Sequence, residues 1–218
     1  NVQVQAATVR NEGKIVSGIQ DDKRIAGKQL KISAERLDNQ GELNASGHLA
    51  VQASAVENTG KIAANSAKLE AKQQVKNSGQ IVTAQTLTVA TQQLDNSGTL
   101  HTESDLRVVA ESVDNRGKIV AAEELNIAAS DLNNSGEMLI DGHLHLHVDG
   151  DLKNTGLIAA KGDADISAGT LTQDGGQILS GQDIQLRIRD VLHNLGVLSA
   201  ARHMRISAAQ LNNDGSLG

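Results

Sequence analysis

The sequence predicts an all-β fold, a parallel β-helix of about 10–11 coils with roughly 19–20 residues and three short strands per coil. Three observations predict it. An Asn-x-Gly motif recurs at a fixed step along the chain, and the apolar residues between motifs alternate with the period of a strand. The chain also has no Phe, Tyr or Trp, so its core must be thin, because globular cores draw much of their buried area from aromatic rings.

The Gly of each motif marks a corner of the coil. The step between markers is 19 residues from Gly41 to Gly136 and 19 or 20 beyond it, with either Gly175 or Gly176 as the marker of one coil. Gly permits a tight turn where φ is positive or where a Cβ would clash, and stacked Asn side chains can bond one another along the axis. We therefore expect a structural corner ladder rather than a ligand site, made of Asn39, Gly41, Asn58, Gly60, Asn77, Gly79, Asn96, Gly98, Asn115, Gly117, Asn134, Gly136, Asn154 and Gly156.

Apolar residues recur at fixed distances from the marker. They stand two residues after it, four residues before it, and as an alternating pair eight and ten residues after it, as in Leu106 and Val108. This spacing predicts three strands per coil, and nothing recurs at a helical period. Nineteen residues are too few for three antiparallel strands with hairpins, so each strand should pair with its counterpart one coil later, at about 4.8 Å.

Two coils depart from the pattern. Gly13 lies 28 residues before Gly41, and the extra residues predict a loop insertion at 17–26 that carries Asp21, Asp22, Lys23 and Arg24. In the coil after Gly60, Leu69 and Ala71 stand one position late, which predicts a β-bulge.

The composition narrows the function classes. The whole chain, 1–218, reads as one repeat segment, and neither end resembles a cap, so we expect a fragment of a longer filament. The absence of Cys excludes a disulfide framework and thiolate metal sites, and the net charge of −6 does not favour nucleic acid as a partner. No apolar run approaches the roughly 20 residues of a membrane span, and no signal peptide is recognisable.

The repeat closely resembles the filamentous haemagglutinin repeats of large bacterial two-partner-secretion exoproteins, which include adhesins and contact-dependent growth inhibition effectors. The motifs that carry the resemblance are Asn-x-Gly-x-(Ile/Leu)-x-Ala, Leu-x-(Val/Ile)-x-Ala and (Leu/Val)-x-Asn, and residues 117–136 match them closely. The resemblance covers essentially the whole chain. It implies a right-handed β-helix, an outer-membrane transporter as partner during secretion, and a location outside the cell or on its surface. The proline-containing secretion domain of that family and any toxin module are not recognisable here.

Two side-chain clusters could bind ligands. His143, His145 and His147 alternate along one strand, roughly 6.5–7 Å apart, and are a weak candidate for Zn²⁺ or Ni²⁺; a solvated strand face is the simpler interpretation. Arg187, Arg189, Arg202 and Arg205 could meet a polyanion such as a sulfated glycan or an anionic lipid headgroup. Asp183 and Asp190 lie among them, and a neutralised surface is the favoured interpretation.

An enzymatic role is the weakest alternative. Asp95 and Asp114 occupy equivalent positions in consecutive coils, about 5 Å apart, a spacing similar to that of a retaining glycosidase pair. Lysine and histidine share their column, and no aromatic platform is present for a sugar. We therefore expect no catalytic site and no cofactor, and predict the structural shaft of a secreted surface exoprotein whose partner is the rest of its own filament. The main alternative is a segment that itself binds glycans through residues 17–26 or through the arginines.

Overall fold

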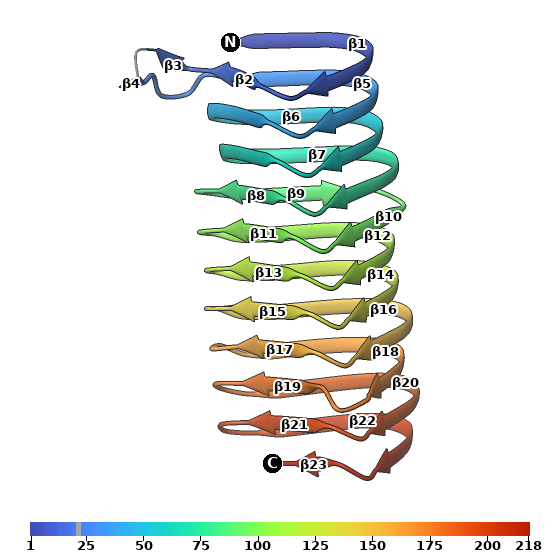
Figure 1. Cartoon of the computed structure of the whole chain (residues 1–218). Helices are drawn as coiled ribbons and strands as arrows, with labels where there is room; N and C mark the ends of the chain where they lie inside the picture. The colour runs from blue at the N-terminus through green and yellow to red at the C-terminus, as the bar shows by residue number, and fades with distance from the viewer. Residues whose placement is uncertain (21–22) are drawn as a thin grey trace.

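The computed structural model describes residues 1–20 and 23–218, which form a parallel β-solenoid of about ten turns with about 19 residues per turn and no helix (Figure 1). The two chain ends lie at opposite ends of the stack. Because consecutive strands are about 4.8 Å apart, ten turns make a rod on the order of 50 Å long. No helix in the described part of the chain is long and apolar enough to cross a membrane.

Each coil has three faces. Face 1 follows the marker Gly and holds β2 (Lys14–Ser17), β8 (Gln80–Thr83), β11 (Thr99–Thr102), β13 (Lys118–Ala121), β15 (Glu137–Ile140), β17 (Leu157–Ala160), β19 (Gln177–Ser180), β21 (Val197–Ala200) and β23 (Ser216–Leu217). We call the turn between faces 1 and 2 corner 1, the turn between faces 2 and 3 corner 2, and the turn that ends at the marker Gly the marker corner.

Faces 2 and 3 are separate strands in one coil, β9 (Leu87–Ala90) and β10 (Gln93–Asn96). Elsewhere one strand bends round corner 2 to cover both: β1 (Val2–Asn11), β5 (Leu30–Asn39), β12 (Asp105–Asn115), β14 (Glu124–Asn134), β16 (His143–Asn154), β18 (Ala164–Gln173), β20 (Ile184–Asn194) and β22 (Met204–Asn213). In two coils a single strand covers all three faces, β6 (Glu42–Asn58) and β7 (Lys61–Asn77).

The core consists of axial columns of like residues. Strands pair in parallel with their counterparts one coil on, so that Leu106 lies between Leu87 and Leu125, and Ile119 lies between Leu100 and Met138. These side chains are at most 1% exposed. Since each coil presents nearly the same inner surface, the core grows by one thin layer per coil.

The coil after Gly60 has the predicted irregularity of strand register, but Leu69 is displaced in the opposite direction. Leu69 pairs with Val51 and Val89, and Ala67 pairs with Leu49 and Leu87. Leu69 therefore fills the second place of the alternating pair, one residue early rather than late. The register shifts at both ends of face 2 in this coil, because corner 1 is one residue shorter than in the preceding coil and corner 2 is one residue longer.

The longer coils carry their extra residues at corners. Leu157 pairs with Gln177, so Gly176 is the marker, and Gly175 is an added residue with φ 71°. Corner 2 has three residues instead of two at Asp149–Asp151 and at 189–191, where the pairing shifts register. The strands themselves keep their length, so the steps of 20 leave the core columns intact.

A hairpin projects from corner 1 of the first described coil, made of β3 (Ile19–Gln20) and β4 (Lys23–Arg24) in antiparallel pairing (Figure 1). Its base contacts the next coil: Ser46 Oγ donates to Ile25 O, and Gly47 N donates to Lys28 O at 2.9 Å. Gly18 has φ 77°, and a Cβ there would also overlap Ser46 Oγ. Asp21 and Asp22 of the expected loop lie outside the described residues.

Candidate functional site

The marker glycines are required by close approach between coils. An ideal Cβ on Gly98 would lie 2.1 Å from the carbonyl oxygen of Gly79, and the same distance recurs at Gly60, Gly79, Gly117 and Gly136. Among the described glycines, φ is positive only at Gly18, Gly27 and Gly175, so of the two reasons that the sequence suggested for a marker glycine, steric exclusion applies. At these glycines, a side chain would force adjacent coils apart.

The marker asparagines form a continuous ladder of buried side chains. Each Nδ2 donates to the Oδ1 of the Asn one coil later, at 2.7–2.8 Å from Asn11 to Asn154. The same amide also donates to a backbone carbonyl beyond the next Gly, as Asn77 does to Thr99 O at 3.1 Å. From Asn39 to Asn154 the ladder residues are 0% exposed, and the structure shows no buried, unsatisfied side-chain polar atom in the part it describes.

The ladder changes partner at Gln173. Asn154 Nδ2 donates to Gln173 Oε1 at 2.8 Å, but Gln173 Nε2 donates to Val197 O at 3.0 Å. Asn194 then begins a second stretch by donating to Asn213. The Asn-x-Gly motif does not identify Gln173, because neither nearby Gly is preceded by Asn at the usual distance. The signal in the sequence is its place two residues after the core residue Leu171.

The three histidines project from face 2, and two of them contact separate partners. His143 Nδ1 accepts a hydrogen bond from Asp163 N at 3.1 Å, and His147 contacts Ser167 Oγ at 2.8 Å and Asp149 Oδ1 at 3.2 Å. All three side chains are exposed. No group of three His, Cys, Asp or Glu side chains in residues 1–20 and 23–218 is arranged to hold a metal ion.

The arginines do not form one patch of free positive charge. Arg187 pairs with Asp165, Arg189 with Asp190 at 3.1 Å and Arg202 with Asp183 at 3.6 Å. His203 donates to Asp183 as well and holds the pKa of that carboxyl below its usual value. Arg187 and Arg205 lie on face 2, whereas Arg202 lies at corner 1 and Arg189 at corner 2, so the four arginines are spread over three parts of the coil.

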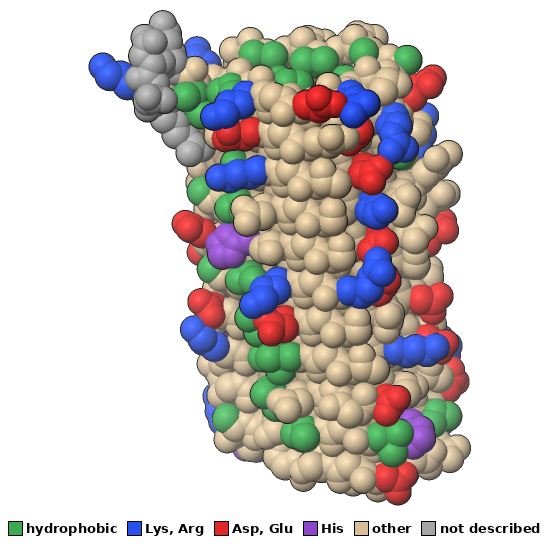
Figure 2. Space-filling view, in the orientation of Figure 1, with side chains coloured by type: hydrophobic (Ala, Val, Ile, Leu, Met, Phe, Trp, Pro, Cys, Tyr) green, Lys and Arg blue, Asp and Glu red, His purple; other side chains and the backbone are tan. Residues whose placement is uncertain are grey.

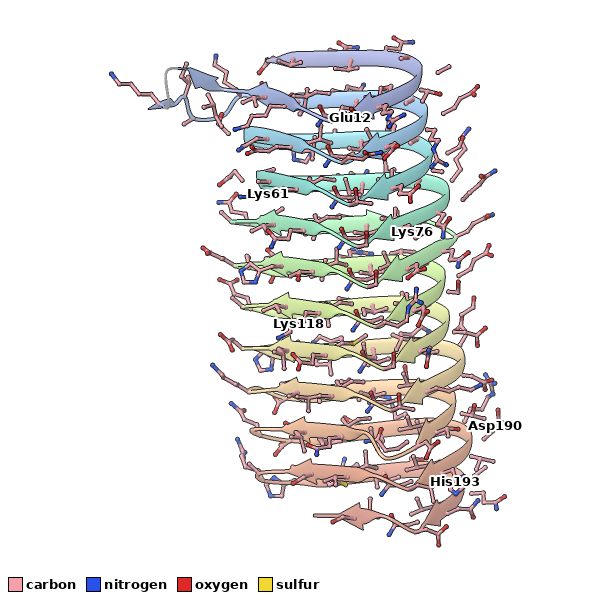
Figure 3. The ribbon with its side chains drawn as sticks, in the orientation of Figure 1. Glu12, Lys61, Lys76, Lys118, Asp190 and His193 are labelled. Atoms are coloured by element: carbon pink, nitrogen blue, oxygen red, sulfur yellow. The ribbon has the colours of Figure 1, made fainter. Side chains whose placement is uncertain are left out.

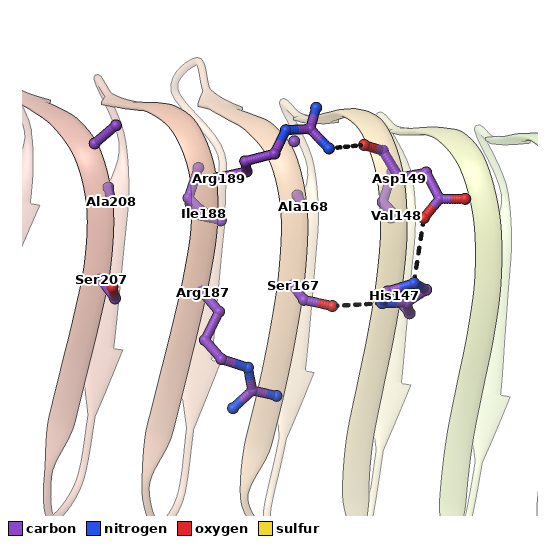
Figure 4. Close-up of a pocket in the computed structure, with 12 residues that line it drawn as sticks. His147, Val148, Asp149, Ser167, Ala168, Arg187, Ile188, Arg189, Ser207 and Ala208 are labelled. Carbon is purple, nitrogen blue, oxygen red and sulfur yellow. Dashed lines mark hydrogen bonds and ion pairs between the residues drawn. The ribbon is translucent and has the colours of Figure 1, made fainter.

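A shallow groove of about 590 Å³ follows corner 2 beside the histidines and arginines (Figure 4). Its floor consists of small residues such as Ala168, Gly169 and Ala208, and its walls include His147, Arg187 and Arg189. Figure 4 shows Arg189 turned along the axis toward Asp149 rather than into solvent. The groove is therefore open but its cations are already engaged.

The paired carboxylates of face 3 are held by an arginine. Asp95 and Asp114 are neighbours in consecutive coils, as expected. Arg116 binds both, through Nη2 to Asp95 and through Nε to Asp114 at 3.4 Å, and the pKa of Arg116 is raised chiefly by its hydrogen bond to Asp95. Figure 3 shows Lys76 and His193 on the same face. A catalytic carboxyl pair must reach the substrate, whereas here one guanidinium group contacts both carboxyl groups.

Comparison with known protein families decides the affiliation. The haemagglutinin repeat profile matches residues 1–89, 62–156 and 159–217, nearly the whole chain. The chain belongs to the haemagglutinin repeat family. No curated protein and no solved structure matched it.

Haemagglutinin repeats occur in secreted and cell-surface exoproteins, and the family implies a two-partner-secretion filament. The family is a structural, adhesin-type family that is not known as enzymatic. Together with the β-solenoid, membership supports a filamentous, adhesin-like shaft.

Proposed function

We propose that this haemagglutinin repeat segment is the load-carrying shaft of a secreted bacterial exoprotein that projects an adhesive or toxin-delivery module from the cell. Its partners are the rest of its own filament and, during secretion, an outer-membrane transporter. The observation that carries the proposal is the axial continuity of the bonding. From Asn11 to Gln173 every coil is joined to the next by parallel backbone pairing and by one buried side-chain amide bond.

This bonding suits a mechanical element. A pull along the axis is opposed by the backbone hydrogen bonds on all three faces and by the asparagine ladder. Each coil contributes a similar share of the core, so no single coil is much weaker than the others. The outer surface offers little that could bind a ligand tightly, because Arg187, Arg189 and Arg202 are neutralised by aspartates. Exposed ion pairs of this kind are screened by solvent, so they also add little to stability.

The main alternative is that the segment itself binds glycans. A glycan and heparin array on the chain, alongside the Arg187→Ala/Arg189→Ala/Arg202→Ala/Arg205→Ala variant, separates the two. A shaft gives no signal, or a weak signal that disappears at physiological salt. Salt-resistant binding to a defined glycan that is lost in the variant would make this segment the adhesive surface and overturn the proposal.

The shaft role also predicts modularity. Deletion of one complete coil, residues 97–115, should leave a folded rod about 4.8 Å shorter, measurable by small-angle X-ray scattering. Deletion of nine residues, 97–105, is the control: it removes half a coil, puts the columns out of register and should abolish folding. A collapsed particle after the whole-coil deletion would contradict an additive shaft.

A further inference from the structure

Face 1 carries an apolar stripe on its outer surface. The third residue after each marker Gly points outward and forms an axial column, in which Val120, Leu139, Ala159 and Leu179 are consecutive and half-buried. The flanking members of the column are polar, His101 before the stripe and Ser199 after it. Figure 2 shows hydrophobic side chains gathered over this part of face 1 with charged side chains on either side.

The charged side chains that follow the face 1 strands change sign along the stripe, from acidic after β15 to basic after β17. At corner 1, next to the middle of the stripe, Asp141 follows β15 and Lys161 follows β17, with side chains 62% and 75% exposed. They pair with each other at 2.7 Å. Further out at corner 1, Glu103 stands in the coil of His101 and Arg202 in the coil of Ser199.

We propose that this stripe is an interface through which two copies of the chain pack side by side and antiparallel. The two-fold axis lies between the two packed faces, runs parallel to the strands and passes between β15 and β17. It places Leu139 opposite Ala159 of the second copy and Val120 opposite Leu179. His101 then faces Ser199 of the second copy, so that the polar residue at each end of the stripe meets a polar residue of the other copy.

The charges select this arrangement. Under the same axis Asp141 faces Lys161 of the second copy, twice over. Glu103 faces Ala201 of the second copy and so comes beside Arg202. Lys118 lies opposite Gln177 of the second copy. Glu137 lies at the rim of the interface and forms an ion pair with Lys118 of its own chain at 3.0 Å. A parallel pairing in register would instead place Glu137 opposite Asp141 of the second copy, which is unfavourable.

The repeat itself favours a second copy as the occupant. The stripe is a flat row of side chains with the strand spacing of about 4.8 Å. A matching row with the same spacing is present on another copy, and in-register rows of this kind interdigitate along their whole length. A contiguous apolar stripe with a charged border is typical of a surface that is covered in the working assembly.

Sedimentation velocity of the 218-residue chain over a wide concentration range tests the interface. We expect a reversible dimer, weakened at least about tenfold by Leu139→Asp, because the substitution places a carboxylate in the apolar row. Val109→Asp is the matched control, since Val109 is an exposed hydrophobic residue on face 2, 43% exposed. A monomer at every concentration would overturn the proposal, as would a dimer weakened by Val109→Asp and not by Leu139→Asp. A dimer formed through the end coils would also be insensitive to Leu139→Asp and would overturn it too.

Two further measurements test the orientation. Asp141→Lys and Lys161→Asp chains should each dimerise poorly alone but pair with each other when mixed, and the double variant Asp141→Lys/Lys161→Asp should recover dimerisation. The chain has no Cys, so Leu139→Cys chains mixed with Ala159→Cys chains should form a disulfide faster than either variant alone. Faster self-coupling of Leu139→Cys chains would indicate the parallel arrangement and overturn the antiparallel one.

Discussion

Arg189 donates through Nη1 to the backbone carbonyl of Asp149, 3.2 Å away and 40 residues earlier in the sequence. The two residues belong to coils that are not adjacent, and the coil between them presents Gly169 at this place. An ideal Cβ on Gly169 would lie 2.8 Å from Arg189 Nη2 and 2.8 Å from Asp149 O. A side chain at residue 169 would therefore interfere with both the guanidinium group and the backbone beneath it.

Gly169→Ala should destabilise the solenoid by about 1–3 kcal/mol, because the added methyl group overlaps backbone that cannot easily move. Arg189→Ala should cost less than about 1 kcal/mol, since the side chain is exposed. Thermal unfolding of the two variants and of the double variant measures the difference. If Arg189→Ala fully rescued Gly169→Ala, the clash would involve the guanidinium group alone, contrary to the close backbone contacts.

Gly98→Ala should be among the most damaging single substitutions, at about 3 kcal/mol or more, because its Cβ would lie 2.1 Å from Gly79 O. Gly13→Ala is the matched control: Gly13 belongs to the same motif, yet a Cβ there meets nothing within 4 Å, and the change should stay within about 0.5 kcal/mol. Denaturation curves of both variants check this. Equal losses would mean that the motif needs Gly for backbone conformation rather than for space.

Asn96→Ala should cost about 2–4 kcal/mol, because it leaves Asn77 Nδ2 without its 2.8 Å acceptor and Asn115 Oδ1 without its 2.8 Å donor in a dry corner. Asn96→Asp should be worse at neutral pH, since a carboxylate cannot donate to Asn115, and should partly recover in acid when the carboxyl is protonated. Asn126→Ala, at an outward position on face 2, is the control and should be nearly neutral. A pH-independent effect of Asn96→Asp would argue against the donor role.

Stability should fall in acid partly through Glu42. Its pKa is lowered from 4.5, first by the hydrogen bond from Asn44 and then by Lys14. The folded state thus favours the carboxylate, and its contribution is present above about pH 4.5 and is lost as the pH falls below that value. The melting temperature of Glu42→Gln should lie below that of the unchanged chain at neutral pH and approach it below pH 4.5. A gap that is constant with pH would contradict the assignment.

The fold was predictable because the core columns depend on spacing alone. The Asn-x-Gly step and the alternating apolar pairs placed the strands, and Leu106 and Val108 lie in the columns that their spacing indicated. Leu69 was assigned to the wrong column because a one-residue change at corner 1 moves the register without altering the alternation. Counting from the marker cannot detect where within a coil a residue is gained or lost.

The outer surface was less predictable, since it depends on which side chains meet across coils. Asp95 and Asp114 were correctly expected to be neighbours, but the role of Arg116 depends on its reach back to Asp95 in the preceding coil, which sequence distance does not give. Gln173 was not predicted as a ladder residue, because it differs from the motif in two ways. It has Gln in place of Asn, and the added Gly175 places it three residues before the marker Gly176 instead of two. In both cases the contact joins residues of different coils, so it is visible only in the folded structure.

The hairpin of β3 and β4 shows what sets the size of this molecule. It enlarges corner 1, yet β1 still pairs with β5, and β2 with β6, in unbroken parallel register. The same holds for Gly175 and for the three-residue corners, which add residues without adding height. The length of the rod therefore depends on the number of coils alone. Insertions at a corner widen the rod locally, and only the gain or loss of a whole coil changes its length.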